Sequence, residues 1–290
     1  MPEPRFAGGL SAFADRYDAF VLDQWGVLHD GANPYPGAIA AVEELVRHGK
    51  KAALLSNSGR RAAKNRERVA AFGFDPAWLT AIVTSGEACW QLLHARPGAP
   101  WDRLGRRCHL LTIGGDLGVV EGLDLELVDD PAQADFILAS GLEPGQTPED
   151  LRWIAEAGTA RGIPLVCSNP DIVAVSPGQL LHAPGAFARI YEELGGTVHY
   201  VGKPHRPIYE VCLGALPGIE PRRIVGIGDS LDHDIRGAVG AGCDSAFVTG
   251  GIHAAEFPAD GDPAGIRAAL ERLCRESGVE PTWVIPALVW

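Results

Sequence analysis

Long hydrophobic runs are missing from this sequence: none approaches the roughly 20 residues that a helix needs to cross a bilayer. The first five residues lack the charged head and apolar core of a secretory signal peptide. Paired cysteines are missing as well, since none of the 6 cysteines belongs to a CxxC pair. We therefore expect a cytoplasmic protein whose cysteines are reduced and pack as small hydrophobic side chains.

Positive charge is also scarce. The chain has 25 lysines and arginines against 37 aspartates and glutamates, which gives a net charge of -12 at pH 7. Nucleic acids and anionic membranes carry dense negative charge, and such a chain would repel them unless it had a strong basic patch. The composition argues against both as main partners, but it allows a small anion held by a few cationic groups.

Short apolar runs alternate with amphipathic helical segments along the 290 residues. This alternation is typical of crossover units and predicts an α/β fold with a doubly wound, mostly parallel sheet. The best division is a core formed by residues 1–86 and 190–290, interrupted by a smaller inserted α/β domain at residues 87–189. Residues 282–290 are unusually apolar, and we expect them to dock on this core as an edge strand; a subunit contact in a homodimer is the alternative.

Hydrophobic spacing and capping signals place the individual elements. The predicted strands span residues 19–22, 51–55, 82–85, 109–113, 136–139, 164–167, 200–202, 224–227 and 245–249. Helices are predicted at residues 37–49 and 60–72, after a capping box at residues 147–150, and from about Pro207, His233 and Asp262. Gly49 should end its helix in the left-handed conformation.

Polar side chains follow four of the predicted strands. They are Asp23, Ser56, Lys203, and the pair Asp229 and Asp234. Because the carboxyl ends of parallel strands meet at one edge of a sheet, these groups are candidates for a common site. Two carboxylates can hold a magnesium ion, while a lysine and a hydroxyl can bind phosphoryl oxygens. The set predicts Mg²⁺-assisted phosphoryl transfer.

In this order the four segments resemble the motifs of the haloacid dehalogenase (HAD) superfamily, type IIA, the NagD-like sugar-phosphatase branch. The matching segments are Asp-Gln-Trp-Gly-Val-Leu at 23–28, Leu-Leu-Ser-Asn at 54–57, Gly-Lys-Pro at 202–204, and Gly-Asp at 228–229 with Asp234. Cys-Ser-Asn-Pro-Asp at 167–171 is similar to the cap-to-core signature of the family. The resemblance implies a HAD-like Rossmannoid core with a cap domain inserted between the second and third motifs.

The resemblance also implies a catalytic role for three residues. Asp23 attacks phosphorus and forms an aspartyl-phosphate, Ser56 donates to a phosphoryl oxygen, and Lys203 neutralises charge and orients Asp23. The substrate is a small phosphorylated metabolite of the sugar phosphate kind, and Asn57 is a further candidate for binding its phosphate.

A metal site and two cap contacts follow from the same resemblance. Asp23, the backbone carbonyl of Trp25 and Asp229 hold Mg²⁺, and Asp234 orients that shell from behind. In the cap, Asn169 and Asp171 are candidates for facing the substrate. An ordinary turn is the alternative for both residues.

Trp25 stands where the family carries a second aspartate, its general acid and base. An indole N–H only donates and does not ionise usefully. Losing a positioned general acid costs roughly 10² to 10⁴ in rate, or about 3 to 5 kcal/mol, and the loss falls hardest on sugar alkoxides. His29, Asp30 and His205 are candidates for supplying the proton, with ordinary loop and turn roles as the alternative, and Trp25 is either a lid or a packing residue.

The leading hypothesis is a magnesium-dependent phosphohydrolase with reduced or unusual turnover. The alternative is a catalytically idle HAD fold that binds a phosphorylated ligand or a protein partner. Dehalogenase chemistry is disfavoured because Asp229 and Asp234 indicate a metal. A nicotinamide enzyme is disfavoured because Gly226 and Gly228 lack the third glycine of a dinucleotide loop.

Overall fold

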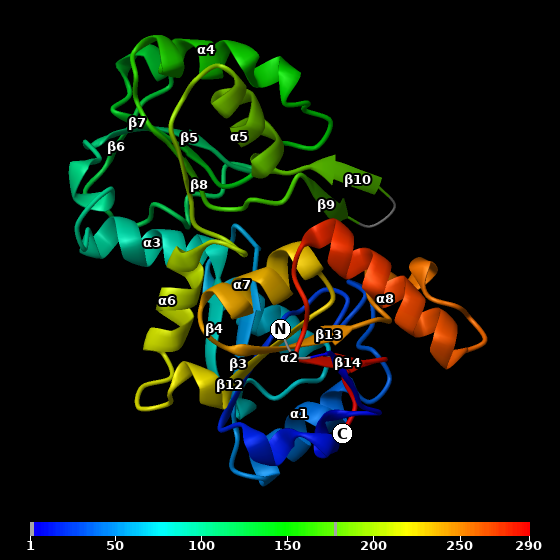
Figure 1. The fold of residues 1–290 in the computed structure, drawn as a ribbon. Coiled ribbons are helices and arrows are strands. Elements are labelled where there is room, and N and C mark those ends of the chain that lie inside the picture. The colour runs from blue at the N-terminus through cyan, green and yellow to red at the C-terminus, as the bar shows by residue number, and fades with distance from the viewer. Residues whose placement is uncertain (1–2, 177–178) are drawn as a thin grey trace. The chain divides into compact units, whose positions relative to one another are not determined.

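Two compact units make up the computed structural model, which describes residues 3–176 and 179–290 (Figure 1). The first unit contains the chain up to Ser56, residues 66–83 and residues 209–290. The second contains residues 57–65 and 84–208. Among the described residues, no helix is both long and apolar enough to span a membrane.

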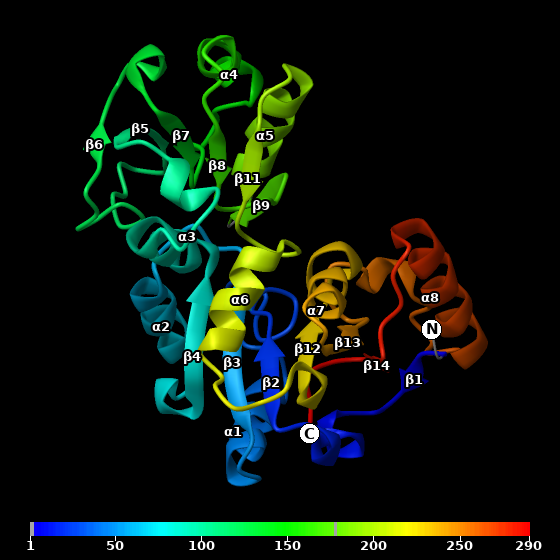
Figure 2. The same cartoon turned by 60° about the vertical axis from the view of Figure 1, so that its left-hand side comes forward.

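The first unit contains a seven-stranded sheet of parallel pairs (Figure 2). In spatial order its strands are β1 (Arg5–Phe6), β14 (Trp283–Ile285), β13 (Asp244–Val248), β12 (Ile224–Gly228), β2 (Ala19–Leu22), β3 (Lys51–Ser56) and β4 (Leu79–Thr84). Every residue of β2 and β12 is buried. Both faces of the sheet are therefore covered at its centre, as the continuous apolar runs of these strands predicted.

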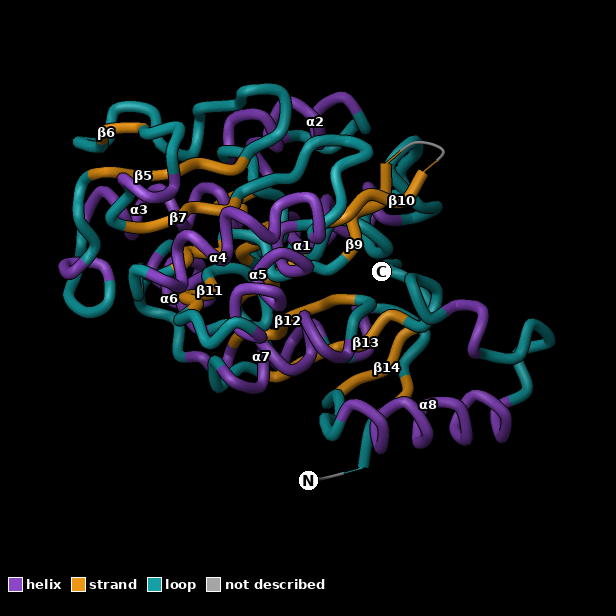
Figure 3. The backbone as a smooth tube through the Cα atoms, turned by 90° about the horizontal axis from the view of Figure 1, so that it is seen from above, coloured by secondary structure: helices purple, strands orange, loops and turns teal. Residues whose placement is uncertain are grey.

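Helices of the first unit follow from amphipathic spacing. The helix α1 (Ala38–Arg47) buries Ala38, Ala41, Val42 and Leu45, which recur at helical intervals. Gly49 follows it with φ +69°, so the predicted left-handed stop is confirmed. The C-terminal helix α8 (Pro263–Ser277) packs on β13 and β14 (Figure 3). The remaining helices associated with this unit are α2 (Ala62–Ala71), α6 (Arg206–Gly214) and α7 (Arg236–Gly240).

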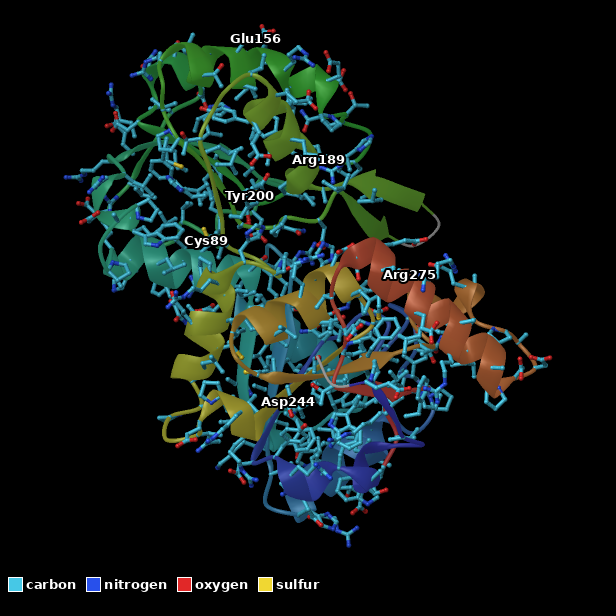
Figure 4. All side chains as sticks on the ribbon, in the orientation of Figure 1. Cys89, Glu156, Arg189, Tyr200, Asp244 and Arg275 are labelled. Atoms are coloured by element: carbon cyan, nitrogen blue, oxygen red, sulfur yellow. The ribbon has the colours of Figure 1, made fainter. Side chains whose placement is uncertain are left out.

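The second unit has its own parallel sheet of five strands. In spatial order these are β11 (Val198–Tyr200), β8 (Leu165–Cys167), β7 (Phe136–Ala139), β5 (Arg107–Leu111) and β6 (Glu126–Leu127). The helices α4 (Arg152–Ala160) and α5 (Pro184–Glu193) share a hydrophobic core with β7 and β8, and α3 (Ser85–Ala95) carries the buried Cys89 (Figure 4). An antiparallel hairpin of β9 (Val173–Ser176) and β10 (Gln179–His182) completes the described strands.

The structure differs from the sequence prediction at the C-terminal boundary of the inserted domain. We assigned residues 190–290 to the core, but β11 pairs with β8, so residues 198–200 belong to the sheet of the second unit. The predicted boundary at 86/87 stays a prediction. Ser85 was assigned to a strand, yet it begins α3, because the Thr84 side chain accepts a hydrogen bond from the Glu87 N–H and caps the helix.

Two local predictions are confirmed by hydrogen bonds or burial. The Thr147 N–H donates to Asp150 Oδ2 at 2.8 Å, and the Asp150 N–H donates to Thr147 Oγ1 at 3.3 Å, which forms the predicted capping box before α4. All six cysteines are free and buried. Burial raises the pKa of the Cys243 and Cys274 thiols to about 11, so they act as packing groups.

The apolar C-terminal segment docks on its own core, as predicted. The Val289 carbonyl accepts a hydrogen bond from the Leu10 N–H at 2.8 Å, and the Trp290 ring stacks on His48 with centroids 4.5 Å apart. The predicted edge position is wrong. β14 lies between β13 and β1, because the short N-terminal strand pairs with its outer side.

Candidate active site

Three predicted site residues lie at the carboxyl edge of adjacent central strands. β2 pairs in parallel with β3 on one side and with β12 on the other (Figure 2). Asp23 directly follows β2, Ser56 ends β3 and Asp229 directly follows β12. In a doubly wound sheet this is the edge where loops converge and ligands bind.

Asp23, Asp229 and Asp234 form a cluster of buried carboxylates. Each offers an oxygen within 4.8 Å of the others, and their exposed fractions are 9%, 3% and 6%. Negative charges held this close and away from water repel one another unless a cation lies between them. Carboxylate oxygens are ligands that magnesium prefers, so this donor set fits the predicted ion.

Two glycines allow the loops to close around Asp229. A Cβ on Gly26 would lie 1.7 Å from Asp229 Oδ2, and a Cβ on Gly251 would lie 2.2 Å from Asp229 Cβ. The Ile252 N–H donates to Asp229 Oδ2 at 2.8 Å. Sequence reasoning missed these positions, because the contacts join separate loops and the Gly26 loop is more than 200 residues from Asp229. Asp229 is thus held by backbone that only glycine permits.

Asp234 is positioned by the turn that begins after β12. It lies on a single π-type turn at Leu231–Ile235, and its Oδ2 accepts the Ser230 N–H at 3.1 Å. The Tyr209 hydroxyl donates to its backbone carbonyl at 3.2 Å. These bonds fix both the main chain and the carboxylate of Asp234, as the orienting role predicted for it requires.

The Trp25 side chain is half-buried and packs on neighbours within the first unit. Its ring lies below the Arg68 guanidinium, at 4.9 Å from centroid to Cζ, and edge-on to the His29 ring at 5.3 Å. A Cβ on Gly31 would lie 2.2 Å from the indole. Of the two predicted roles for this residue, the contacts support packing.

His29 and Asp30 have the ordinary loop and turn roles that were the alternative to supplying a proton. His29 is fully buried, its Nδ1 accepts the Gly31 N–H at 3.1 Å, and its ring packs on Phe72 at 4.5 Å. Burial lowers the pKa of His29, and the nearby Arg68 charge lowers it further, to about 4. Asp30 Oδ1 accepts the N–H groups of both Ala32 and Asn33, so this carboxylate stabilises a turn.

The buried neutral His29 should make the protein sensitive to acid. The pKa of histidine in an unfolded chain is about 6.5, so below that pH the unfolded state binds a proton that the folded state does not bind until about pH 4. Between pH 7 and 4.5 this residue should lower the free energy of unfolding by about 2 kcal/mol. Urea unfolding at the two pH values, compared with His29→Phe, measures the difference. Equal pH dependence in both proteins would contradict the assignment.

Other predicted site residues meet in a hydrogen-bond network within the second unit. Asn57 Oδ1 accepts the Lys203 N–H at 2.7 Å, and Asn57 Nδ2 donates to the Lys203 carbonyl at 3.1 Å and to Asp171 Oδ1 at 2.7 Å. A Cβ on Gly202 would lie 2.6 Å from Asn57 Oδ1. The Asn57 amide therefore fixes the main chain of Lys203, whose side chain is buried.

The remaining candidates of the second unit are engaged locally. Asn169 Oδ1 accepts the Asp171 N–H at 2.9 Å, which is the turn alternative considered for this segment. The His205 ring stacks on Tyr200, labelled in Figure 4, with centroids 4.6 Å apart and an interplanar angle of 9°. Tyr200 ends β11, so this stack lies against the second sheet.

Comparison with known proteins identifies the family. Models of haloacid dehalogenase-like hydrolases match residues 20–126 and 104–242, and a model of HAD-like hydrolases matches residues 200–286. A crystal structure of a hydrolase of the haloacid dehalogenase-like family from Brucella suis 1330 is 33% identical, covers 100% of both chains and superposes with a TM-score of 0.79. The chain belongs to the haloacid dehalogenase-like hydrolases. The predicted family, hydrolase class and α/β fold are confirmed.

Two phosphatases are similar to parts of the chain. The dihydroxyacetone phosphatase of Corynebacterium glutamicum (strain R) is 33% identical over 92 residues, 31% of this chain and 33% of that protein. The sugar-phosphatase AraL of Bacillus subtilis (strain 168) is 27% identical over 238 residues, 80% of this chain and 82% of that protein. The chain thus spans about a third of the first relative and most of the second.

Proposed function

We propose that this HAD-like hydrolase is a magnesium-dependent phosphatase that acts on a small phosphorylated metabolite through an aspartyl-phosphate. The observation that carries the proposal is the buried cluster of Asp23, Asp229 and Asp234 at the carboxyl edge of the central strands. Two relatives named as phosphatases of dihydroxyacetone and of sugars support a small phosphorylated substrate.

The reaction divides into two displacements at phosphorus. A carboxylate oxygen of Asp23 attacks, and the leaving group departs with the electrons of the bridging P–O bond. Ser56 donates a hydrogen bond to a phosphoryl oxygen, and the Lys203 ammonium balances the negative charge that gathers there. Water then attacks the phosphorus and releases phosphate from Asp23.

The metal ligands proposed for this chain are Asp23, the Trp25 carbonyl and Asp229, with Asp234 behind them. The carbonyl role does not depend on the side chain, so the packed indole of Trp25 is compatible with it. A bound Mg²⁺ would supply positive charge that lets an anionic nucleophile approach an anionic phosphate.

The proposal is tested with p-nitrophenyl phosphate. In the presence of Mg²⁺, Asp23→Asn should lower kcat/KM by at least about 10⁴-fold, because the amide oxygen is a poor nucleophile. EDTA should abolish the activity of the unmodified protein, and added Mg²⁺ should restore it. The matched control is Asp30→Asn, an exposed turn residue whose substitution should leave activity within about threefold.

A catalytically idle HAD fold is the competing function, and the packed Trp25 at the acid position favours it. It predicts equal background rates for the unmodified protein and Asp23→Asn. It further predicts no gain of activity in Trp25→Asp when Mg²⁺ still binds. Those two results together would replace the phosphatase proposal with a binding role.

A further inference from the structure

We infer that the substrates of this protein are phosphate compounds whose leaving group departs without receiving a proton, such as acyl and aryl phosphates, rather than phosphorylated alcohols. The inference rests on the proposed phosphatase function and narrows its substrate class. It follows from where the structure places Trp25 and from the contacts of the groups that are candidates to replace the missing acid.

The acid position itself is occupied by the packed indole. The ring of Trp25 lies against the Arg68 guanidinium and against Gly31, where no Cβ would fit. An indole N–H can donate a hydrogen bond but does not release its proton in this pH range. Trp25 therefore cannot protonate a leaving oxygen, whichever way the ring is turned.

The ionisable groups of the same loop are committed to structure. His29 is fully buried, with its ring against Phe72 and its Nδ1 bonded to the Gly31 N–H. Asp30 is exposed and holds two N–H groups of a turn. Both side chains are held by these contacts within the loop that also carries Trp25.

Two further groups are engaged in contacts of their own within the second unit. The His205 ring is stacked on Tyr200, and Asp171 Oδ1 accepts a hydrogen bond from Asn57 Nδ2.

The chemistry then depends on the leaving group. A carboxylic acid has a pKa of about 4 and a phenol has a pKa of about 10, so a carboxylate or phenolate departs readily. An alkoxide is a much stronger base, similar to hydroxide, because an alcohol resembles water, whose pKa is about 16. Asp23 forms its bond to phosphorus, the bridging P–O bond breaks, and the electron pair leaves on a carboxylate or phenolate with no proton transferred. Loss of a general acid costs roughly 10² to 10⁴ in rate where that proton is needed.

In the second displacement the leaving group also departs without receiving a proton. The aspartyl-phosphate is itself an acyl phosphate, so the Asp23 carboxylate leaves without a proton when water attacks. One proton of the attacking water stays on its oxygen and the other passes to a second oxygen of the departing phosphate, which leaves as dihydrogen phosphate and then loses a proton to the solvent. Without a general base this water attack is slow, so hydrolysis of the aspartyl-phosphate should limit kcat, and good leaving groups should give a burst of product.

The test is the dependence of kcat/KM on the leaving group. A series of phenyl phosphates from 4-nitrophenyl to unsubstituted phenyl varies the pKa of the leaving phenol while the shape of the substrate stays nearly constant. Acetyl phosphate represents the acyl phosphates, and glycerol 3-phosphate represents the phosphorylated alcohols. We expect kcat/KM to fall steeply along the phenyl series, acetyl phosphate to be turned over, and glycerol 3-phosphate to lie at least about 100-fold below 4-nitrophenyl phosphate. Trp25→Asp should raise the ratio of glycerol to nitrophenyl kcat/KM by about 100-fold, and Trp25→Asn, which is equally small but does not ionise, should not.

The outcomes separate the inference from the function on which it rests. A flat phenyl series, or glycerol 3-phosphate within tenfold of 4-nitrophenyl phosphate, would overturn the inference and leave an Asp23-dependent phosphatase in place. Equal rates in the unmodified protein and Asp23→Asn for all substrates would overturn both. Should Trp25→Asp fail to fold, the phenyl series of the unmodified protein alone decides.

Discussion

Asp229→Asn should abolish stabilisation of the protein by Mg²⁺. The Asp229 carboxylate is 3% exposed and within 4.8 Å of the other two carboxylates, so removing its charge takes away one of the proposed ligands without changing the shape of the side chain. An ion that binds only the folded state at 100 times its dissociation constant stabilises it by about 3 kcal/mol. Thermal unfolding with and without Mg²⁺ should show this shift in the unmodified protein and lose it in Asp229→Asn, with kcat/KM at least about 10³-fold lower.

The control for this substitution is Asp232→Asn in the same turn. Asp232 is exposed and pairs with Arg236 at 2.8 Å on the surface, so the same chemical change should leave the Mg²⁺ shift intact. An unaltered Mg²⁺ shift in Asp229→Asn would show that the three carboxylates are not the metal site.

Gly26→Ala should weaken Mg²⁺ binding by about 10- to 100-fold, comparable to the loss of an orienting contact in other metal sites. A Cβ here would lie 1.7 Å from Asp229 Oδ2, so the carboxylate or the loop must move. Gly26 also has φ +79°, at which a side chain is strained. Calorimetric titration with Mg²⁺ measures the affinity directly and does not depend on turnover.

The control Gly49→Ala separates the effect of backbone strain from the effect of the clash between a Cβ and Asp229. Gly49 has φ +69° with nothing within 4 Å of an added Cβ, so alanine there should cost only about 1 kcal/mol of stability and leave Mg²⁺ affinity unchanged. Equal Mg²⁺ affinity in Gly26→Ala and Gly49→Ala would mean that Asp229 is not held by the approach of Gly26.

The central strands and the polar residues at their ends could be predicted from the sequence because both signals are local. An apolar run such as residues 19–22 predicts a buried strand by itself, and the residue after it then lies at the carboxyl edge. For the same reason the α1 stop at Gly49 and the capping box of Thr147 and Asp150 were predicted correctly.

Features that depend on contacts between distant segments could not be predicted. The sequence predicts a strand at residues 200–202, and the structure has it at residues 198–200. Its pairing with β8 rather than with the core sheet depends on tertiary structure. The packing of Trp25 on Arg68 and Gly31 depends on how the loop folds back toward α2. The close approach of Gly26 and Gly251 to Asp229 needs two loops from opposite halves of the chain.

The pairing of β1 with β14 sets the order in which this protein can be completed during synthesis. Arg5 pairs with Trp283 and Phe6 with Val284, so β1 has no partner until β14 has been synthesised. The second sheet needs only residues 107–200 and can form while the ribosome has yet to make β12 and Asp229. Asp229 and Asp234 therefore join the acidic cluster only after every residue of the second sheet has been synthesised.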